Sequence, residues 1–345
     1  MTGTKSASPL ETITLSRLLD HRFPARQDLI TPWLRQGESA MLWAAPGVGK
    51  TLLTLTMALM VAGGGSALGW TASKPRKVLL VDGEMSAEDL QDRVATLMET
   101  IEGIDREAAG RNLFVMSRSW QHDSVSFPDL GDRETGNARV SGQDVVFQKV
   151  TALGIELVLA DNFSTLVEVA DENDASSMNA TLAFLLRLKA ARVGCVLVHH
   201  SGKTGESYRG SSKLATTFEV IIGLKATDGL AVNDGAAFRL FWEKYRRERS
   251  AAVRSKNVRL TTIEGQTRWV VEETADDAMH QLVAAVMTCD FNTGRAIAAH
   301  LGWDTGKVSR TKQAAIRSGL IDEAGWDRWL KEVVEVGAEE TTEDF

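Results

Sequence analysis

Cysteine is scarce in this chain of 345 residues. Only Cys195 and Cys289 are present, and their spacing provides neither a metal-ligand motif nor a disulfide framework. A small, disulfide-stabilised secreted fold is therefore excluded. So few cysteines are typical of a protein in a reducing compartment, and a cytoplasmic location is expected.

Long apolar runs are also absent. The most apolar segment, residues 52–63, falls well short of the roughly 20 residues that a membrane-spanning helix needs. Residues 1–12 contain no apolar core of the kind that a signal peptide has. These absences predict a buried helix over 52–63 and no membrane partner.

An excess of positive charge is lacking as well, because the formal net charge is −7. This balance argues against a protein that coats nucleic acid with its whole surface, but it allows a local basic patch. A hydrophobic content of 43% and a charged content of 25% are ordinary for globular proteins. The length predicts one large domain with a smaller appendage.

What is present is an alternation of short apolar segments with amphipathic ones. Apolar, β-rich runs predict strands at 40–45, 77–82, 112–116, 156–161 and 194–200. The helices predicted between them are 50–63, 86–100, 143–153 and 173–191. Because strands that are apolar on both faces lie between helix layers, this alternation predicts an α/β domain with a doubly wound parallel sheet.

Later runs lack helices between them and predict an antiparallel extension of the sheet. These runs are 218–226, 236–244, 258–264 and 267–273. The polar segment 117–142 is expected to form a surface loop. The predicted organisation is a leader over 1–25, a large domain over 26–274, a small domain over 275–334 and an acidic, disordered tail over 335–345.

The segment "AAPGVGKT", residues 44–51, fits the spacing of a phosphate-binding loop, with Ala44 in place of the usual first glycine. Glycines let backbone N–H groups turn toward phosphate oxygens, and the N-terminus of the following helix adds positive potential. Lys50 is expected to reach the β- and γ-phosphates of ATP, and Thr51 to ligate Mg²⁺. The predicted nucleotide-binding residues of this loop are Pro46, Gly47, Val48, Gly49, Lys50, Thr51 and Leu52.

Two acidic residues at strand ends compete for the role of second metal anchor. Asp161 closes "ELVLAD" and is favoured, while Asp82 in "LLVDGE" is the alternative. Glu84 follows the latter strand, where a carboxylate can activate the water that attacks the γ-phosphate. By itself Glu84 is an exposed residue ahead of a helix that Ser86 caps. Beside a phosphate-binding loop it is the predicted general base.

Two histidines, His199 and His200, end the strand "GCVLVHH" and are predicted to sense the γ-phosphate. Since side chains alternate along a strand, only one of them can face the nucleotide. No further ligands at zinc-binding spacing accompany them, so no zinc site is expected.

The order of these parts resembles the RecA-like core of hexameric replicative helicases. The segment "KVLLVDGEMSAEDLQDRV" is similar to the one that carries the catalytic glutamate in DnaB-type enzymes. "HHSGK" at 199–203, followed by "RGSS" at 209–212, is closer still to plasmid RepA-type helicases. The resemblance covers about residues 25–272, and the insertion 117–142 has no counterpart in it.

The resemblance implies further roles. Arg93 would stack on adenine, and the histidine pair would couple the γ-phosphate to a DNA-facing loop, 201–213, that carries Lys203 and Lys213. Lys244 and Arg246 in "EKYRR" are similar to a pair that DnaB-type helicases insert into a neighbouring subunit's site. Arg246 would be the arginine finger, with Arg209 as the runner-up. The alternative for Arg246 is a solvated, basic strand end.

Residues 277–332 resemble a winged helix-turn-helix, in which Asp304 caps a helix and "LIDEAGWDRWLKEVV" forms a short hairpin. The residues of this helix predicted to approach DNA are Lys307, Arg310, Thr311 and Arg317. A small helical bundle for protein contacts is the alternative.

These features predict a homo-hexamer that uses ATP and Mg²⁺ to move along single-stranded DNA. It would act as a helicase in the replication of a plasmid, phage or mobile element, with a primase, an initiator and a single-strand-binding protein as partners. Two alternatives remain: a RecA/RadA-like recombination ATPase, and an ATP-switched DNA-binding regulator.

Overall fold

The computed structural model describes most of the chain. The described residues are 12–120, 142–162, 175–202, 216–227, 235–247, 253–273, 275–288, 290–317 and 319–330. Most of the insertion and the whole acidic tail lie outside these ranges.

Within the described residues, a nine-stranded sheet has the order β13-β12-β11-β10-β3-β9-β8-β6-β7. Its parallel strands are β3 (Ser39–Ala44), β6 (Val78–Asp82), β7 (Leu113–Ser117), β8 (Leu157–Asp161), β9 (Gly194–His200) and β10 (Val220–Ala226). The antiparallel strands are β11 (Ala237–Tyr245), β12 (Lys256–Ile263) and β13 (Gln266–Glu273). This arrangement confirms the predicted fold class, a RecA-like P-loop core with a parallel sheet extended by antiparallel strands.

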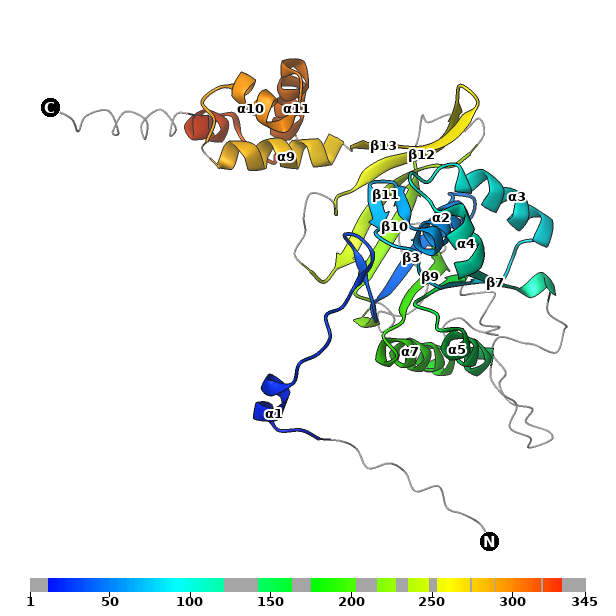
Figure 1. The fold of residues 1–345 in the computed structure, drawn as a ribbon. Helices are drawn as coiled ribbons and strands as arrows, with labels where there is room; N and C mark the ends of the chain where they lie inside the picture. The colour runs from blue at the N-terminus through cyan, green and yellow to red at the C-terminus, as the bar shows by residue number, and fades with distance from the viewer. Residues whose placement is uncertain are drawn as a thin grey trace, which may run out of the picture.

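Helices cover both faces of the sheet (Figure 1). One face carries α2 (Lys50–Gly63), α3 (Ala87–Met98) and α4 (Arg106–Asn112), and the other carries α5 (Gly142–Leu153) and α7 (Ala175–Ala190). The helix predicted over 52–63 is the buried α2. None of the described helices is both long and apolar enough to cross a membrane.

The sequence interpretation was wrong about one strand. β10 was expected in the antiparallel extension, but it pairs parallel to β3, with Val220 beside Ala40 and Leu224 beside Ala44. A parallel neighbour requires the chain to cross from one end of the sheet to the other before the strand begins. The first residue of β10 therefore lies at the amino-terminal ends of the parallel strands, whereas the phosphate-binding loop lies at their carboxyl ends.

Small elements outside the nine-stranded sheet were not predicted. They are α1 (Leu15–Asp20) and the short strands β1 (Asp28–Ile30), β2 (Leu34–Arg35), β4 (Gly65–Ala67) and β5 (Trp70–Ala72). Trp33, between β1 and β2, and Trp70 of β5 pack edge-to-face on each other (ring centroids 5.2 Å apart) and on Trp242 of β11 (5.9 and 6.3 Å). This aromatic cluster ties the N-terminal segment to the antiparallel part of the sheet.

The C-terminal part forms its own apolar cluster from α9 (Ala275–Met287), α10 (Gly294–Leu301) and α11 (Thr305–Arg317). As predicted, Asp304 caps α11, because its Oδ1 accepts a hydrogen bond of 2.7 Å from the Lys307 amide. The expected hairpin is wrong: residues 323–330 are helical, and Asp322 accepts a bond from the Gly325 amide at the helix start. The winged helix-turn-helix assignment is therefore not supported.

Candidate nucleotide-binding site

The phosphate-binding loop joins the buried strand β3 to the N-terminus of α2. Gly47 and Gly49 adopt φ angles of 77° and 116°, which side chains of L residues rarely tolerate. A Cβ atom on Gly49 would also lie 2.6 Å from the Ala236 Cβ. Both conformation and close packing therefore require glycine at this position. The loop places the first turn of α2 beside the carboxyl end of β3. The backbone N–H groups that begin a helix can stabilise an anion there.

Lys50 is folded over this loop. Its Nζ donates hydrogen bonds of 2.9 Å to the carbonyl oxygens of Ala44 and Ala45. Burial lowers the pKa of Lys50, while the carboxylates of Asp161 and Glu84 oppose this shift. The buried ammonium group donates to neutral carbonyl oxygens, and a charged phosphate oxygen would accept a stronger hydrogen bond from it.

Asp161 and Thr51 form the part of the site that suits Mg²⁺. Asp161 is 5% exposed, and the Thr51 hydroxyl hydrogen-bonds to its carboxylate. The other carboxylate oxygen, Oδ2, is buried and accepts no hydrogen bond from the described residues. A carboxylate and a hydroxyl are the oxygen ligands that Mg²⁺ prefers, together with phosphate oxygens and water. These two residues fit the metal that the phosphate-binding loop implies.

Asp82, the alternative metal anchor, has a different structural position. It lies beside Asp161 in the sheet, but its Oδ2 accepts bonds from the Met85 amide (3.1 Å) and the Ser117 hydroxyl (3.2 Å). The Met85 bond closes the turn that follows β6 and carries Glu84, while the Ser117 bond ties Asp82 to the neighbouring strand β7. Asp82 thus supports the turn rather than lining the cavity.

Glu84 belongs to a polar cluster with two neighbours on adjacent strand ends. The Asn162 side-chain amide donates to Glu84 Oε1, and the same nitrogen lies 2.6 Å from His200 Nε2. His200 Nε2 is 3.5 Å from Glu84 Oε1. Asn162 is completely buried and was missed by the sequence interpretation. Its position directly after Asp161, at the carboxyl end of a buried strand, was the signal available.

A cavity of about 370 Å³ opens above these strand ends. Its lining residues are Pro46, Gly47, Gly49, Lys50, Thr51, Leu52, Glu84, Arg93, Asp161 and His200. Arg93, from α3, also lines it, and its stacking on adenine stays a prediction. Two predicted residues close to the cavity do not line it. Val48 packs into the core, and His199 is 3% exposed on the other face of β9.

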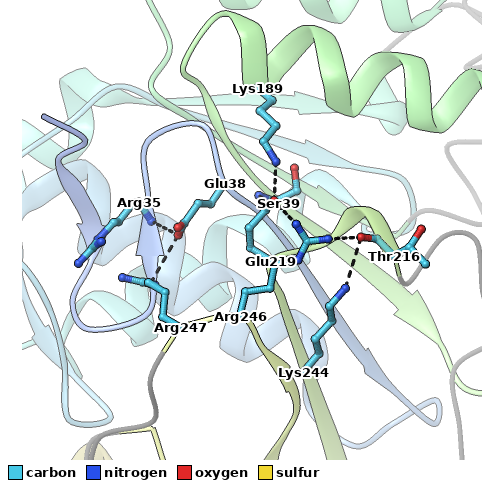
Figure 2. Close-up of polar contacts among 9 residues, drawn as sticks. All are labelled: Arg35, Glu38, Ser39, Lys189, Thr216, Glu219, Lys244, Arg246 and Arg247. Carbon is cyan, nitrogen blue, oxygen red and sulfur yellow. Dashed lines mark hydrogen bonds and ion pairs between the residues drawn. The ribbon is translucent and has the colours of Figure 1, made fainter. Parts of the chain in front are cut away.

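Arg246 and Lys244 lie at the opposite edge of the sheet. Arg246 follows the end of β11, next to Glu219 and hence beside Ser39 at the start of β3 (Figure 2). At about 3.3 Å per residue, β3 separates this edge from the phosphate-binding loop by roughly 20 Å. Neither side chain lines the cavity described above.

The remaining predicted residues divide into two groups. Lys203, Arg209 and Lys213 lie outside the described residues. Lys307 and Arg310 lie on α11, where the Lys307 ammonium sits 4.0 Å from the centroid of the Trp303 ring and Arg310 is 3.9 Å from Asp304. Thr311 is buried at 9% exposure and faces the helical core, so its predicted approach to DNA is wrong.

The buried carboxylate of Asp161 predicts a pH-dependent stability of the metal-free protein. Burial, above all, raises its pKa from 3.8 to about 6. The folded state thus binds this proton more tightly than the unfolded chain, and ionisation increasingly destabilises the fold as the pH rises through that range. Asp161→Asn removes the penalty. Without Mg²⁺ and nucleotide, we expect the variant to be more stable than the parent by on the order of 1–3 kcal/mol near pH 8.

Thermal melts followed by circular dichroism across this pH range provide the measurement. The difference in stability between Asp161→Asn and the parent should decrease as the pH falls toward about 4.5, because Asp161 of the folded parent then keeps its proton. Added Mg²⁺ and ADP serve as the control and should stabilise the parent more than the variant. If the stability difference between the two proteins does not change with pH, Asp161 is not the group whose raised pKa destabilises the fold.

In a comparison with known protein families, residues 4–206 match a family model described as an AAA domain. No curated protein matches the chain. Among solved structures, a KaiC-like protein of the hyperthermophilic archaeon Pyrococcus horikoshii OT3 is 14% identical, with a TM-score of 0.48 over 70% of this chain and 93% of that one. The RadB recombinase is 15% identical, with a TM-score of 0.44 over 68% of this chain and 91% of that one.

Proposed function

The chain belongs to this AAA-domain family, and from that premise we propose that it is an ATP-driven DNA translocase that unwinds duplexes as a ring of identical subunits. Mg·ATP would bind in the cavity above β3, β8 and β6. Single-stranded DNA would pass through the ring. The replicative role and the partners expected from the sequence belong to the same proposal.

One observation carries the proposal: the separation of Arg246 from its own cavity. Hydrolysis needs a cation that stabilises charge on the transferring phosphoryl group. Lys50 supplies one from within the subunit, while Arg246 lies at the other end of β3 with half of its side-chain surface exposed. In a head-to-tail ring, this edge of one subunit would meet the cavity of the next. Each site would then lie between two subunits.

The residues of the cavity would divide the reaction between them. Lys50 would exchange the carbonyls of its loop for phosphate oxygens, and Glu84 would accept a proton from the water that attacks the γ-phosphorus. The bond to the leaving oxygen breaks, giving ADP and phosphate. Thr51 and Asp161 would hold Mg²⁺, which, when bound, would supply positive charge that favours phosphoryl transfer.

His200 would report the state of the γ-phosphate. It contacts the Glu84 cluster at the end of β9, and residues 201–213, expected to form a DNA-facing loop, follow it directly in the sequence. A change in this contact on hydrolysis would reposition the loop on DNA. Small polar and basic residues such as those of this loop follow a phosphate backbone without reading its sequence.

Unwinding of a forked duplex tests the proposal. With ATP and Mg²⁺, we expect the protein to release the labelled strand of a fork, and Lys50→Ala to lose at least about 100-fold of this activity. A blunt duplex without single-stranded arms is the matched control substrate. Strand exchange or duplex binding without strand release, under conditions where ATP is hydrolysed, would instead identify a recombination ATPase or a DNA-binding regulator.

A further inference from the structure

A buried carboxylate, Glu219, lies at the edge of the sheet where Arg246 is found. Its side chain is 10% exposed. Oε2 accepts a hydrogen bond of 2.9 Å from the Ser39 amide, and Oε1 lies 2.5 Å from Lys189 Nζ and 3.6 Å from Arg246 Nη1 (Figure 2). Glu219 therefore joins the start of β3, the end of α7 and the residue that follows β11.

The second side of the Arg246 guanidinium is held by a backbone carbonyl. Its Nη2 donates to the oxygen of Thr216, which Lys244 Nζ also approaches at 3.4 Å. The guanidinium is thus fixed between a carboxylate and a carbonyl. Half of the Arg246 side-chain surface nevertheless remains exposed.

A β-bulge directs these cations to the Glu219 side of the sheet. Ile221 pairs with Lys244 but Ile222 pairs with Trp242, so Glu243 is the extra residue. Side chains alternate in a regular strand, and an extra residue reverses the alternation beyond it. Tyr245 accordingly turns to the opposite face, where its hydroxyl donates to the Pro32 carbonyl. Arg246, one residue later, faces Lys189 and Glu219.

The charges at this edge explain why the arrangement holds. A carboxylate this buried is costly unless cations and hydrogen bonds compensate it. Lys189 and Arg246 both compensate Glu219, and the Ser39 amide adds a directed bond. Removing the negative charge would leave two cations near each other. A long arginine side chain with half its surface in water would then sample many rotamers.

We propose that Glu219 is the positioning residue for Arg246, holding its guanidinium in the place from which it reaches ATP bound to the adjacent subunit. This inference rests on the proposed function, since it requires Arg246 to act across a subunit junction. Glu219 touches neither substrate nor reacting atoms. Its contribution is to limit the conformations of the Arg246 side chain before the subunits meet. The side chain then loses less conformational entropy when the transition state forms.

Glu38 supplies a matched control at the same edge. It is 5% exposed, accepts a 2.9 Å bond from the Arg35 amide, and lies 3.5 Å from Arg247. It resembles Glu219 in burial, in a backbone bond and in an arginine neighbour. Its neighbour, however, is not the residue assigned to the junction.

The experiment compares Glu219→Gln with Glu38→Gln in the full-length protein, using DNA-stimulated ATP hydrolysis. For Glu219→Gln we expect kcat to fall by roughly 10–100-fold, with KM for ATP changed by less than about threefold, because ground-state binding is retained in the same cavity. Glu38→Gln should keep kcat within about threefold of the parent. Equal losses in both variants would show that the edge is merely structural.

Mixing subunits separates positioning of Arg246 from damage to the local fold. Lys50→Ala subunits cannot hydrolyse ATP but carry an intact Arg246. Mixed with Glu219→Gln subunits, they should restore hydrolysis above the sum of the two separate rates, because intact cavities then meet intact arginines. Absence of restoration would place Glu219 in its own subunit's chemistry and overturn the inference.

Two further variants keep the test decisive. Glu219→Asp retains the buried charge but moves it away from Arg246 by one methylene group. It replaces Glu219→Gln if that variant has a much lower melting temperature than the parent. An unchanged kcat in Glu219→Asp would overturn the inference. Arg246→Ala separates the two proposals. If it is as active as the parent, the junction assignment itself fails. If it is impaired while Glu219→Gln is not, only the positioning role fails.

Discussion

Glu84→Gln is expected to lower the rate of ATP hydrolysis by about 10²–10⁴-fold while leaving ATP binding within a few-fold of the parent. The substitution preserves the shape of the side chain and its ability to accept a hydrogen bond from Asn162. It removes the basic oxygen that takes the proton from the attacking water. Because the phosphate contacts are expected to come from the loop before α2, ATP binding should survive. Single-turnover hydrolysis and fluorescent-nucleotide binding provide the two measurements.

A neighbouring glutamate provides the control for Glu84. Glu88 lies in the first turn of α3, is exposed, and does not line the cavity. Glu88→Gln should hydrolyse ATP at nearly the parental rate. If Glu84→Gln behaves in the same way, Glu84 is only an exposed residue ahead of a capped helix. In that case the cluster with Asn162 and His200 would have a structural function.

The sequence was most informative where local chemistry determines structure. Glycines at special φ angles, a lysine and a threonine at fixed spacing, and carboxylates at the ends of apolar strands identified Lys50, Thr51, Glu84 and Asp161. The structure gathers all four around one cavity. They could be identified because parallel strands end at a common edge, so that a residue's position in its own strand is enough to place it.

Long-range pairing was the part that the sequence could not supply. Nothing in residues 218–226 distinguishes a parallel neighbour of β3 from an antiparallel one, since both are apolar runs. The extra residue Glu243 is invisible until β10 and β11 are paired. Glu219 was not predicted for the same reason: its partners Ser39, Lys189 and Arg246 come from distant parts of the chain.

Arg246→Ala is expected to lower DNA-stimulated hydrolysis by about 10³–10⁵-fold, the usual contribution of an arginine finger. The loss should appear in kcat rather than in nucleotide binding, because Arg246 is absent from the cavity of its own subunit. Arg247→Ala is the matched control. The Arg247 guanidinium lies over the Tyr245 ring at 5.2 Å and beside Glu38, so its loss should affect activity only slightly.

Subunit mixing tests the direction of the contact. Arg246→Ala subunits retain a complete cavity, and Lys50→Ala subunits retain a complete arginine, so neither protein alone should hydrolyse ATP appreciably. In a mixture, junctions that join the two intact halves should recover hydrolysis. Recovery requires that the arginine and the cavity come from different copies, because within one chain the length of β3 keeps them roughly 20 Å apart. Full activity of Arg246→Ala alone would mean that its edge serves folding only, and that each cavity completes its chemistry without a neighbour.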